Sequence, residues 1–403
     1  TSSVNAHHHS SAPVLEPSSG RRHKALLRTT GPSIAARVFF SDENVRELQP
    51  ERSGGDDGWQ SRSRQIGVGA YGSVFRATWR GKEVAVKLLR LPDEPSSGGS
   101  DAKDALRAKL TEIVEDFTKE VEICCDLAHP NLVTLLGYAT QPELLLMQEL
   151  MEGNSIDQQL YNEKWKPTTA QILKVALDVA SGMAYLHTAF QEHRTVRNPT
   201  KSGKRNFVDK PVIHRDLKSP NLLLRYPPPP RGQEGIARDL VCKISDFGLS
   251  RDKRIEDNSH AKTAIMTGCG SILWMAPEIM LGEKYNEKVD VYSYAMCLLE
   301  LVHRNLPWHG TGVGQQAIPV RVTKGQRPDA QLRKCRPPEL KELIRNCWDQ
   351  EPHKRPEFPE IMHSVNEMYV KETTQTRASR KGRAAKSSRP ASPDVHPDRI
   401  DEE

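Results

Sequence analysis

Three glycines in the N-terminal third of the chain are the first residues whose spacing suggests chemistry. Gly67, Gly69 and Gly72 follow the order G-x-G-x-x-G. Because glycine has no Cβ, a turn at these positions could close over phosphate groups and present backbone N–H groups to them at short range. The pattern alone is weak evidence, because dinucleotide-binding folds share it. The alternative is a plain glycine-rich hairpin, which the strand-like run ending in Lys87 disfavours.

Four further motifs follow in chain order: Val84-Ala85-Val86-Lys87, His214-Arg215-Asp216-Leu217-Lys218-Ser219-Pro220-Asn221, Asp246-Phe247-Gly248 and Ala276-Pro277-Glu278. Each is short enough to occur by chance, but the ordered set is specific. Over residues 60–370 the chain therefore resembles a eukaryotic protein kinase. The resemblance implies transfer of the γ-phosphoryl group of ATP to protein hydroxyls in signal transduction, with Mg²⁺, or Mn²⁺ in its place, as the metal.

The resemblance also implies roles for the residues of these motifs. Asp216 is expected to be the catalytic base that orients the acceptor hydroxyl, and Lys218 to stabilise charge on the moving phosphoryl group. Asn221 and Asp246 are expected to bind the metal, because Mg²⁺ prefers hard oxygen ligands.

Lys87 ends an apolar strand, where an unpaired ammonium group would be costly. We therefore expect a fixed acidic partner, and the resemblance points to a helix glutamate that positions the α- and β-phosphates with Lys87. Glu120 and Glu122 are the two candidates. Glu120 is preferred because Phe117 and Val121 then lie on the helix face that packs against the sheet.

A nucleotide site is expected from the remaining matches to the family. Gln148 falls at the gatekeeper position, behind the adenine, unless the hinge placement is wrong by one residue. The backbone of Glu149 and Met151 is expected to bind the adenine edge. The other residues expected to contact ATP are Ile66, Gly67, Val68, Gly69, Ala70, Tyr71, Gly72, Ser73, Val74, Ala85, Lys87 and Leu223.

The fold class implied is α+β, the two-lobed kinase fold. It has a small antiparallel β-sheet lobe with one helix and a larger, mostly helical lobe. Runs of β-forming residues predict strands at 65–67, 74–79, 84–89, 132–136 and 144–150, and a helix is predicted over 103–125. In the second lobe, apolar residues at three- and four-residue spacing predict a helix from residue 170 onward, and further helices are predicted at 289–303 and 338–348.

The predicted domain spans residues 59–370, with lobes at 59–151 and 152–370 and insertions at 92–102, 188–210 and 226–239. Residues 1–58 and 371–403 are rich in Ser and charge and are predicted to be disordered, the second as a basic and then acidic tail. The run Pro227-Pro228-Pro229-Pro230 is either an ordinary loop or a polyproline ligand for an SH3 or WW module.

Composition and charge limit the partners and the cellular compartment that we expect for this chain. A net charge of +6, from 58 Lys and Arg against 52 Asp and Glu, is too diffuse to indicate nucleic-acid binding. Seven cysteines without repeated C-x-x-C spacing favour a reducing compartment. A cytoplasmic location is expected, with a nuclear location left open by the basic tail. Because the chain begins at Thr1, we expect a fragment, and membrane attachment through an upstream segment also stays open.

Two features favour Ser or Thr as the acceptor. The run Lys218-Ser219-Pro220 resembles serine/threonine kinases, and 271–275 lacks the proline usual in tyrosine kinases. Trp274-Met275-Ala276-Pro277-Glu278 resembles the tyrosine-kinase-like group, which includes Raf, mixed-lineage and many plant kinases. The rival interpretations are a pseudokinase that binds nucleotide without transfer, and the kinase part of a larger receptor.

Regulation is expected in the segment between Asp246 and Glu278. In the family, the arginine before the catalytic aspartate, here Arg215, meets a phosphate on this segment. Thr263 or Thr267 is the favoured acceptor, ahead of Ser259. Ser271 is expected instead to hydrogen-bond Asp216 and Lys218, and Glu278 to pair with Arg355.

Overall fold

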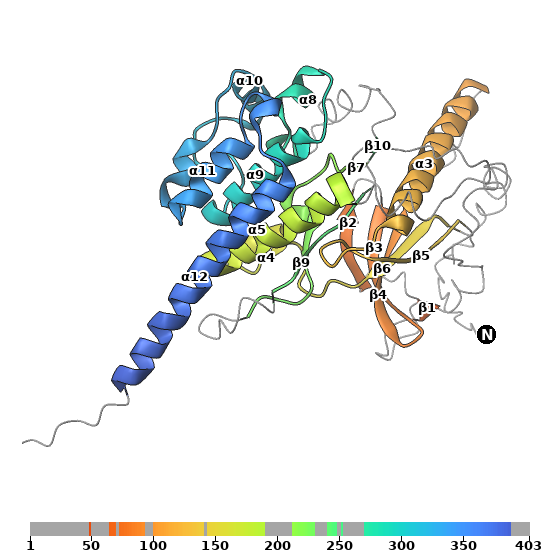
Figure 1. Cartoon of the computed structure of the whole chain (residues 1–403). Coiled ribbons are helices and arrows are strands. Elements are labelled where there is room, and N and C mark those ends of the chain that lie inside the picture. The colour runs from red at the N-terminus through yellow and green to blue at the C-terminus, as the bar shows by residue number, and fades with distance from the viewer. Residues whose placement is uncertain are drawn as a thin grey trace, which may run out of the picture. The chain divides into compact units, whose positions relative to one another are not determined.

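The computed structural model describes residues 48–49, 64–69, 72–92, 100–140, 143–189, 212–229, 240–247, 251–252 and 270–387 of the chain (Figure 1). These residues form two compact units. The N-terminal unit contains the described residues up to 126 together with 134–150, and the C-terminal unit contains 127–133 and the residues from 151 onward. The predicted insertions fall largely outside the described residues.

The N-terminal unit is built on one antiparallel sheet. Its strand order is β1-β3-β4-β6-β5, and β2 pairs with β3 on the same edge as β1. The strands are β1 (Leu48–Gln49), β2 (Gln65–Gly69), β3 (Gly72–Trp79), β4 (Lys82–Leu89), β5 (Leu135–Ala139) and β6 (Leu145–Glu149). Arg80 and Gly81 connect β3 to β4 with positive φ angles of 49° and 76°, as a two-residue hairpin requires.

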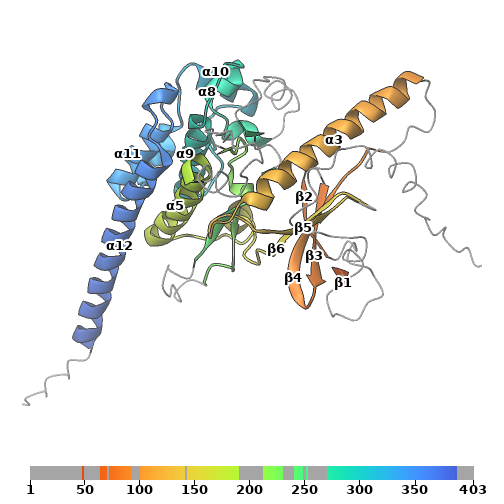
Figure 2. The ribbon, with the colours of Figure 1, turned by 45° about the vertical axis from the view of Figure 1, so that its right-hand side comes forward.

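The helix α3 (Ser100–Asp126) crosses one face of this sheet (Figure 2). Val114, Phe117 and Val121 of the helix pack with Leu144 and Leu146 in one buried cluster. The opposite face has its own cluster, listed by its buried members Ala77, Val84, Val86, Ala139, Leu145 and Met147. Successive residues of β6 are therefore buried on both faces, which explains why its sequence is a continuous apolar run instead of an alternating one.

The C-terminal unit is mostly helical. Its α-helices are α4 (Ile156–Tyr161), α5 (Thr169–Ala184), α8 (Pro277–Leu281), α9 (Lys288–His303), α10 (Ile318–Thr323), α11 (Pro338–Cys347) and α12 (Phe358–Ser387). Short turns are η2 (Tyr185–Ala189), η3 (Ser219–Asn221), η5 (Gly270–Leu273), η6 (Gln315–Ala317), η7 (Asp329–Lys334) and η8 (Pro352–Lys354). Two small antiparallel pairs join β7 (Val212–Ile213) to β10 (Arg251–Asp252) and β8 (Leu222–Leu224) to β9 (Cys242–Ile244).

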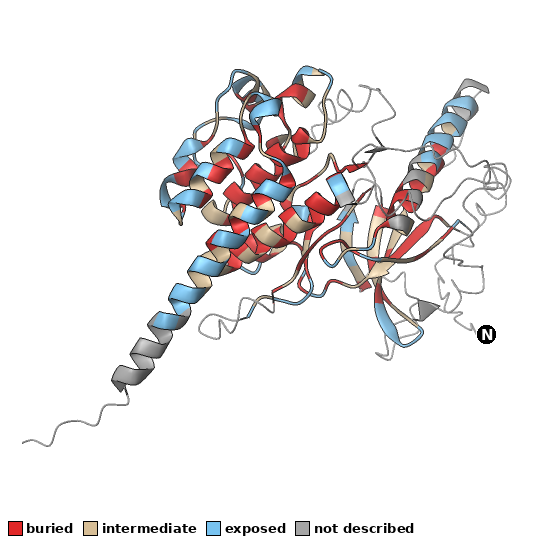
Figure 3. Ribbon diagram, in the orientation of Figure 1, coloured by how far each residue is buried: buried red, intermediate tan, exposed pale blue. Residues whose placement is uncertain are grey.

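The helix α9 is the centre of this unit. Every residue from Lys288 to Leu301 is buried, so the helix is covered on all sides, as Figure 3 shows. The helix α5 begins with a capping box in which Thr168 and Gln171 bond each other's backbone N–H. Its predicted apolar stripe, which includes Ile172 and Met183, is buried.

Three predictions about elements need correction. The predicted strand at 132–136 begins at Leu135, because Leu132 instead bridges Ile244 of β9 in the C-terminal unit. Leu48 and Gln49, predicted to be disordered, extend the sheet by pairing with Trp79 and Thr78. Residues 371–387, also predicted to be disordered, continue α12. This stretch holds three Ala, three Lys and three Arg residues, which favour helix, and no proline.

Candidate active site

Asp290 of α9 accepts hydrogen bonds from the backbone of the loop that carries Asp216. One Asp290 carboxylate oxygen accepts from the His214 N–H at 2.8 Å, and the other accepts from the Arg215 N–H at 2.8 Å. His187 contacts the same carboxylate at 3.0 Å. Burial by itself would raise the Asp290 pKa, but the hydrogen bond and charge of His187 lower it, so the carboxylate is held ionised. Asp290 therefore braces the loop through backbone hydrogen bonds.

Asp216 lies in a closed set of polar contacts. The Lys218 Nζ is 2.7 Å from one carboxylate oxygen, and the Ser271 hydroxyl donates to the other at 3.0 Å. Lys218 also donates to the Ser271 hydroxyl at 2.9 Å. Ser271 therefore bonds both Asp216 and Lys218, as predicted. The geometry shows that this carboxylate accepts from a hydroxyl group while an ammonium group contacts the same hydroxyl oxygen.

Asn221 contacts the same aspartate. Its Nδ2 donates to the Asp216 backbone carbonyl at 2.7 Å and to the carboxylate at 3.1 Å. Because the amide nitrogen is engaged, the side-chain oxygen is the atom that Asn221 could offer to a metal. The Ser245 N–H and hydroxyl both donate to the Asn221 carbonyl, at 2.9 and 3.1 Å, which brings the neighbouring Asp246 close to Asn221. The donor set is hard oxygen and fits Mg²⁺.

Two aromatic residues support this region. Phe247 is buried, and its ring centre lies 5.3 Å from that of His214. The His214 Nε2 contacts the Ser245 carbonyl at 3.1 Å. Both residues are fully buried and pack against each other.

In the N-terminal unit, Lys87 of β4 pairs with Glu120 of α3. The Lys87 Nζ lies 3.1 Å from Glu120 Oε1, and Glu120 is 4% exposed. Phe117 and Val121 are buried on the same helix, so the face predicted to pack inward does so. The alternative Glu122 lies on α3, and its side chain is outside the described residues.

Strand register brings several predicted nucleotide residues onto one face of the sheet. Val74 pairs with Lys87, and Arg76 with Ala85, while Ala85 also pairs with Gln148. Residues that pair directly, or that are two apart on a strand, share a face. Val74, Ala85, Lys87 and Gln148 are therefore neighbours, and all four are partly exposed.

The glycine-rich hairpin is formed by β2 and β3. A Cβ at Gly72 would meet the Leu88 backbone oxygen at 2.0 Å, so the sheet itself requires glycine there. A Cβ at Gly67 would make only ordinary contacts of 3.7 and 3.8 Å with Val74, so the part of the chain that the structure describes gives no steric reason for that glycine. Ile66 and Val68 are exposed, and Ser73 bonds Gln65 at 2.9 Å. Gly69 is the last residue of β2.

The remaining predicted residues are placed as follows. The Glu149 N–H donates to the Thr134 carbonyl at 3.1 Å, so this N–H is engaged within the protein. Met151 is buried, and Leu223 is half-buried on β8. The Arg215 guanidinium lies over the Tyr285 ring at 5.1 Å. Ala70, Tyr71, Ser259, Thr263 and Thr267 lie outside the described residues.

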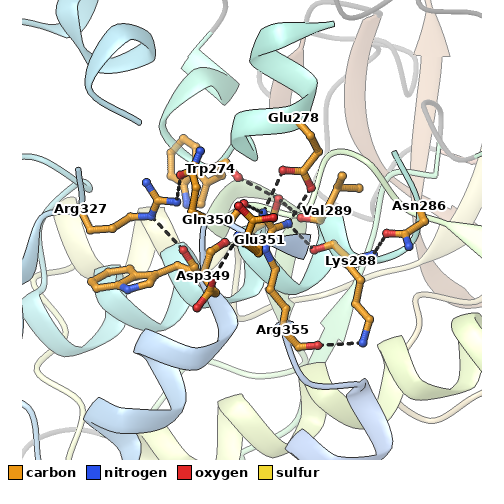
Figure 4. Close-up of polar contacts among 12 residues, drawn as sticks. Trp274, Glu278, Asn286, Lys288, Val289, Arg327, Asp349, Gln350, Glu351 and Arg355 are labelled. Carbon is orange, nitrogen blue, oxygen red and sulfur yellow. Dashed lines mark hydrogen bonds and ion pairs between the residues drawn. The ribbon is translucent and has the colours of Figure 1, made fainter. Parts of the chain in front are cut away.

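The predicted pair of Glu278 and Arg355 is confirmed as a buried, bidentate contact (Figure 4). Arg355 donates to the two carboxylate oxygens at 2.6 and 2.9 Å. The same guanidinium donates to the backbone carbonyls of Lys288 and Asp349, at 3.0 and 2.9 Å. Because the buried charges have partners on every side, this cluster serves as scaffold for α8 and α9.

Sequence reasoning missed Glu300, a second buried carboxylate of α9. It accepts hydrogen bonds from the Tyr161 hydroxyl at 2.5 Å, the Ser219 hydroxyl at 2.6 Å and the Trp274 Nε1 at 3.1 Å. Burial raises the pKa of Glu300 to about 7, although these three donors oppose the shift. Glu300 thus ties the loop after Asp216 to the segment before Glu278. In the sequence, the only sign of this buried role was a glutamate within an otherwise apolar helix segment.

Comparison with known proteins identifies the family. The model of the protein kinase domain matches residues 60–366, and the chain belongs to that family. Among its relatives, the serine/threonine-protein kinase VIK of Arabidopsis thaliana is 34% identical over 314 residues, which cover 78% of this chain and 60% of VIK. The serine/threonine-protein kinase STY17 of the same plant is 32% identical over 341 residues, or 82% of this chain and 50% of STY17.

A third relative is the probable serine/threonine-protein kinase drkD of Dictyostelium discoideum, 34% identical over 299 residues, which cover 74% of this chain and 19% of drkD. The chain thus spans between about a fifth and three fifths of the length of these relatives.

VIK and STY17 belong to the tyrosine-kinase-like group, which confirms the resemblance to that group. No helix among the described residues is long and apolar enough to cross a membrane.

Proposed function

We propose that this chain transfers the γ-phosphoryl group of ATP to serine or threonine hydroxyls of proteins. One observation carries the proposal: the Asp216 carboxylate accepts from the Ser271 hydroxyl at 3.0 Å while Lys218 contacts the same hydroxyl oxygen at 2.9 Å. A general base must lie within hydrogen-bond reach of the proton that it accepts. A substrate hydroxyl beside Asp216 would meet the same two groups.

In this proposal each residue has a limited task. Asp216 orients the acceptor hydroxyl and takes its proton, and Lys218 stabilises charge that develops on the transferred group. Asn221 and Asp246 hold Mg²⁺, which neutralises phosphate charge when bound. Lys87, fixed by Glu120 at 3.1 Å, positions the α- and β-phosphates.

The nucleotide site proposed from the sequence lies along the exposed side of the β2–β3 hairpin and along the sheet face that carries Lys87. Gly67 supports it, because no atom of the described residues explains the lack of a side chain there and a close phosphate would. Val74, Ala85 and Gln148 lie on the face that also carries Lys87. Action in a signalling pathway, and an SH3 or WW partner for residues 227–230, remain predictions.

Phosphoamino-acid analysis after incubation with radiolabelled ATP, Mg²⁺ and mixed protein acceptors tests the proposal. We expect label on serine and threonine for the wild type and none for Lys87→Met. Lys82→Met is the matched control, because Lys82 is an exposed lysine on the same strand. Because Glu120 loses its partner in Lys87→Met, the double variant with Glu120→Gln checks that the loss is not unfolding. Normal labelling by folded Lys87→Met would overturn the site, and nucleotide binding without any transfer would favour the pseudokinase.

A further inference from the structure

The C-terminal helix α12 continues past the part of the C-terminal unit that it packs against. Its first half is anchored, because Phe358 and Val365 are buried. Beyond the ion pair of Lys371 with Glu339 of α11, at 3.1 Å, no residue of α12 whose burial is described is buried. In Figures 1 and 2 this second half extends beyond α5 and α11. The segment 371–387 is thus helical but, in its described residues, not part of the packed core.

This segment is strongly basic. It holds one acidic residue, Glu372, against six basic ones. The basic residues are Lys371, Arg377, Arg380, Lys381, Arg383 and Lys386. The segment therefore carries a charge of +5, compared with +6 for the whole chain. The net charge of the chain gave no sign of nucleic-acid binding, but the charge of this one helix does.

Within the segment, no acidic residue offsets these charges at the spacing of helical neighbours. Residues three or four apart are neighbours on a helix, so Arg377 has Arg380 and Lys381 beside it. Arg383 follows Arg380 at the same spacing. Glu372 has no basic residue at either spacing. Like charges at these spacings repel, so an anionic partner that neutralised them would stabilise the helix.

The arrangement of the basic residues favours a groove over a flat surface. With 3.6 residues per turn, the six positions fall at intervals of roughly 40° to 80°, so each side of the helix has a basic position. A membrane surface contacts one side of a helix, and helices that bind it place large apolar residues there. The apolar residues of this segment are three alanines. The major groove of DNA admits a helix and places phosphates on both sides of it.

The dimensions of the helix fit the same groove. A helix rises about 1.5 Å per residue and is about 10 to 12 Å across, so the segment is about 25 Å long. The major groove is about 12 Å wide. Duplex DNA carries about one charge per 1.7 Å of its axis, so about fifteen phosphate charges lie along that length. This number is sufficient for each of the six basic residues to contact a phosphate.

We propose that residues 371–387 of α12 bind duplex DNA, lying in the major groove with basic side chains against the phosphates of both strands. Because phosphate contacts carry no sequence information, binding does not depend on the base sequence. Such binding would hold the chain beside protein substrates on the same duplex. The inference goes beyond the proposed function, and its test requires no phosphoryl transfer.

Fluorescence anisotropy of a labelled duplex of about 20 base pairs, titrated with the full chain at about 50 to 200 mM NaCl, tests the proposal. The logarithm of the association constant should fall with the logarithm of the salt concentration at a slope of about −3 to −5, because each neutralised phosphate contributes about −0.9. No binding at about 50 mM NaCl, or affinity that does not fall with salt, would overturn the proposal.

Arg380→Gln/Arg383→Gln removes two charges from the segment, and Gln favours helix about as well as Arg. The slope should shrink by about two, and binding at about 0.1 M NaCl should weaken at least about tenfold. Arg333→Gln/Lys334→Gln is the matched control, because both are exposed basic residues of η7 in the same unit. The control should bind almost as the wild type does. Equal losses in the two folded variants would show that DNA is not bound by α12.

Gly382 allows the helix to be tested without a change of charge. Gly382→Pro breaks the helix and should weaken binding by about tenfold or more. Gly382→Ala favours the helix and should strengthen binding up to about fivefold. Circular dichroism measures the helix content of both variants. Equal affinity of the two would show that charge alone binds DNA, which would overturn the placement of a helix in the groove.

Other partners are outcomes of the same assay. An RNA duplex, whose major groove is too narrow for a helix, should bind more weakly, and equal affinity would contradict the groove. Tighter binding to vesicles of phosphatidylserine and phosphatidylcholine than to DNA would assign the helix to a membrane. The chain ends with five acidic residues from Asp394 onward. DNA binding that appears only after removal of residues 394–403 would assign the helix to that segment and overturn the proposal for the full chain.

Discussion

At the scale of single residues, the candidate site is organised by carboxylates with different surroundings. Asp216 is in contact with an ammonium group and a hydroxyl group, which fix the orientation of its carboxylate. Asp290 is fully buried but accepts two backbone N–H groups and contacts His187, and its pKa is lowered. Glu300 is equally buried, and three neutral donors do not offset its loss of hydration, so its pKa is raised.

The raised pKa of Glu300 predicts a pH dependence of stability. An unfolded glutamate ionises near 4.5, and the folded one near 7, so the folded chain keeps a proton between these values that the unfolded chain has released. The contribution of Glu300 to folding therefore falls as pH rises from 4.5 to 7 and is constant above. Between pH 5 and pH 8, the unfolding free energy of wild type relative to Glu300→Gln should drop by roughly 2 to 3 kcal/mol.

Urea unfolding of both proteins at pH 5, 6, 7 and 8 measures this change. Glu342→Gln, at an exposed position on α11, serves as the control and should follow the wild-type profile. Parallel profiles for wild type and Glu300→Gln would show that Glu300 is ionised at normal pH in the folded chain.

At the scale of elements, short connections position the chemistry and longer helices support them. Asp290 on α9 fixes the loop before Asp216, and Glu300, ten residues later on α9, fixes the loop after it. A fully buried helix is suited to this task because packing on all sides limits its movement. The Arg355 and Glu278 pair then joins the segment before α12 to α8.

Gln331 of η7 hydrogen-bonds the backbone of the loop that follows α9, at Leu306, Trp308 and His309. These contacts give a prediction at this scale. Gln331→Leu removes three hydrogen bonds and leaves the Trp308 N–H and two carbonyls without that partner, which should cost roughly 2 to 4 kcal/mol of stability. Gln316→Leu, at an exposed residue of η6, is the control. Full stability of Gln331→Leu would show that the amide does not position the loop.

At the scale of the whole molecule, phosphorylation between Asp246 and Glu278 is expected to increase activity. The Arg215 guanidinium lies over the Tyr285 ring, a contact worth about 0.5 to 1 kcal/mol at exposed sites. A phosphate accepts charge-assisted, bidentate bonds from a guanidinium and should compete well for it. Phosphatase treatment should therefore reduce transfer, and re-incubation with ATP should restore it with phosphate on Thr263 or Thr267.

Mass mapping of the restored protein identifies the phosphorylated residue. The Thr263→Ala/Thr267→Ala variant should stay at the dephosphorylated level. Full activity after complete dephosphorylation, or wild-type activity of this variant, would show that phosphorylation of this segment does not control activity.

Local sequence patterns predicted much of the fold and of the candidate site. The strands around Val84 and the helix stripe with Ile172 have regular apolar spacing, which depends on neighbours in sequence. The roles of Glu300 and Gln331 were not predictable in this way, because their partners lie up to 139 residues away and follow only from the folded chain. The error over residues 371–387 has another cause: charge was taken as a sign of disorder in a stretch that also favours helix.

The central claim is that Asp216 accepts the proton of a serine or threonine hydroxyl during phosphoryl transfer, and the rate of labelling from radiolabelled ATP tests it most directly. Asp216→Asn retains the size of the side chain but removes its charge and basicity. With saturating ATP, Mg²⁺ and one serine peptide, we expect this variant to lose about 10²- to 10⁴-fold in kcat. Nucleotide binding and thermal stability should stay close to those of wild type. A folded Asp216→Asn variant that labels the peptide at the wild-type rate would contradict the claim.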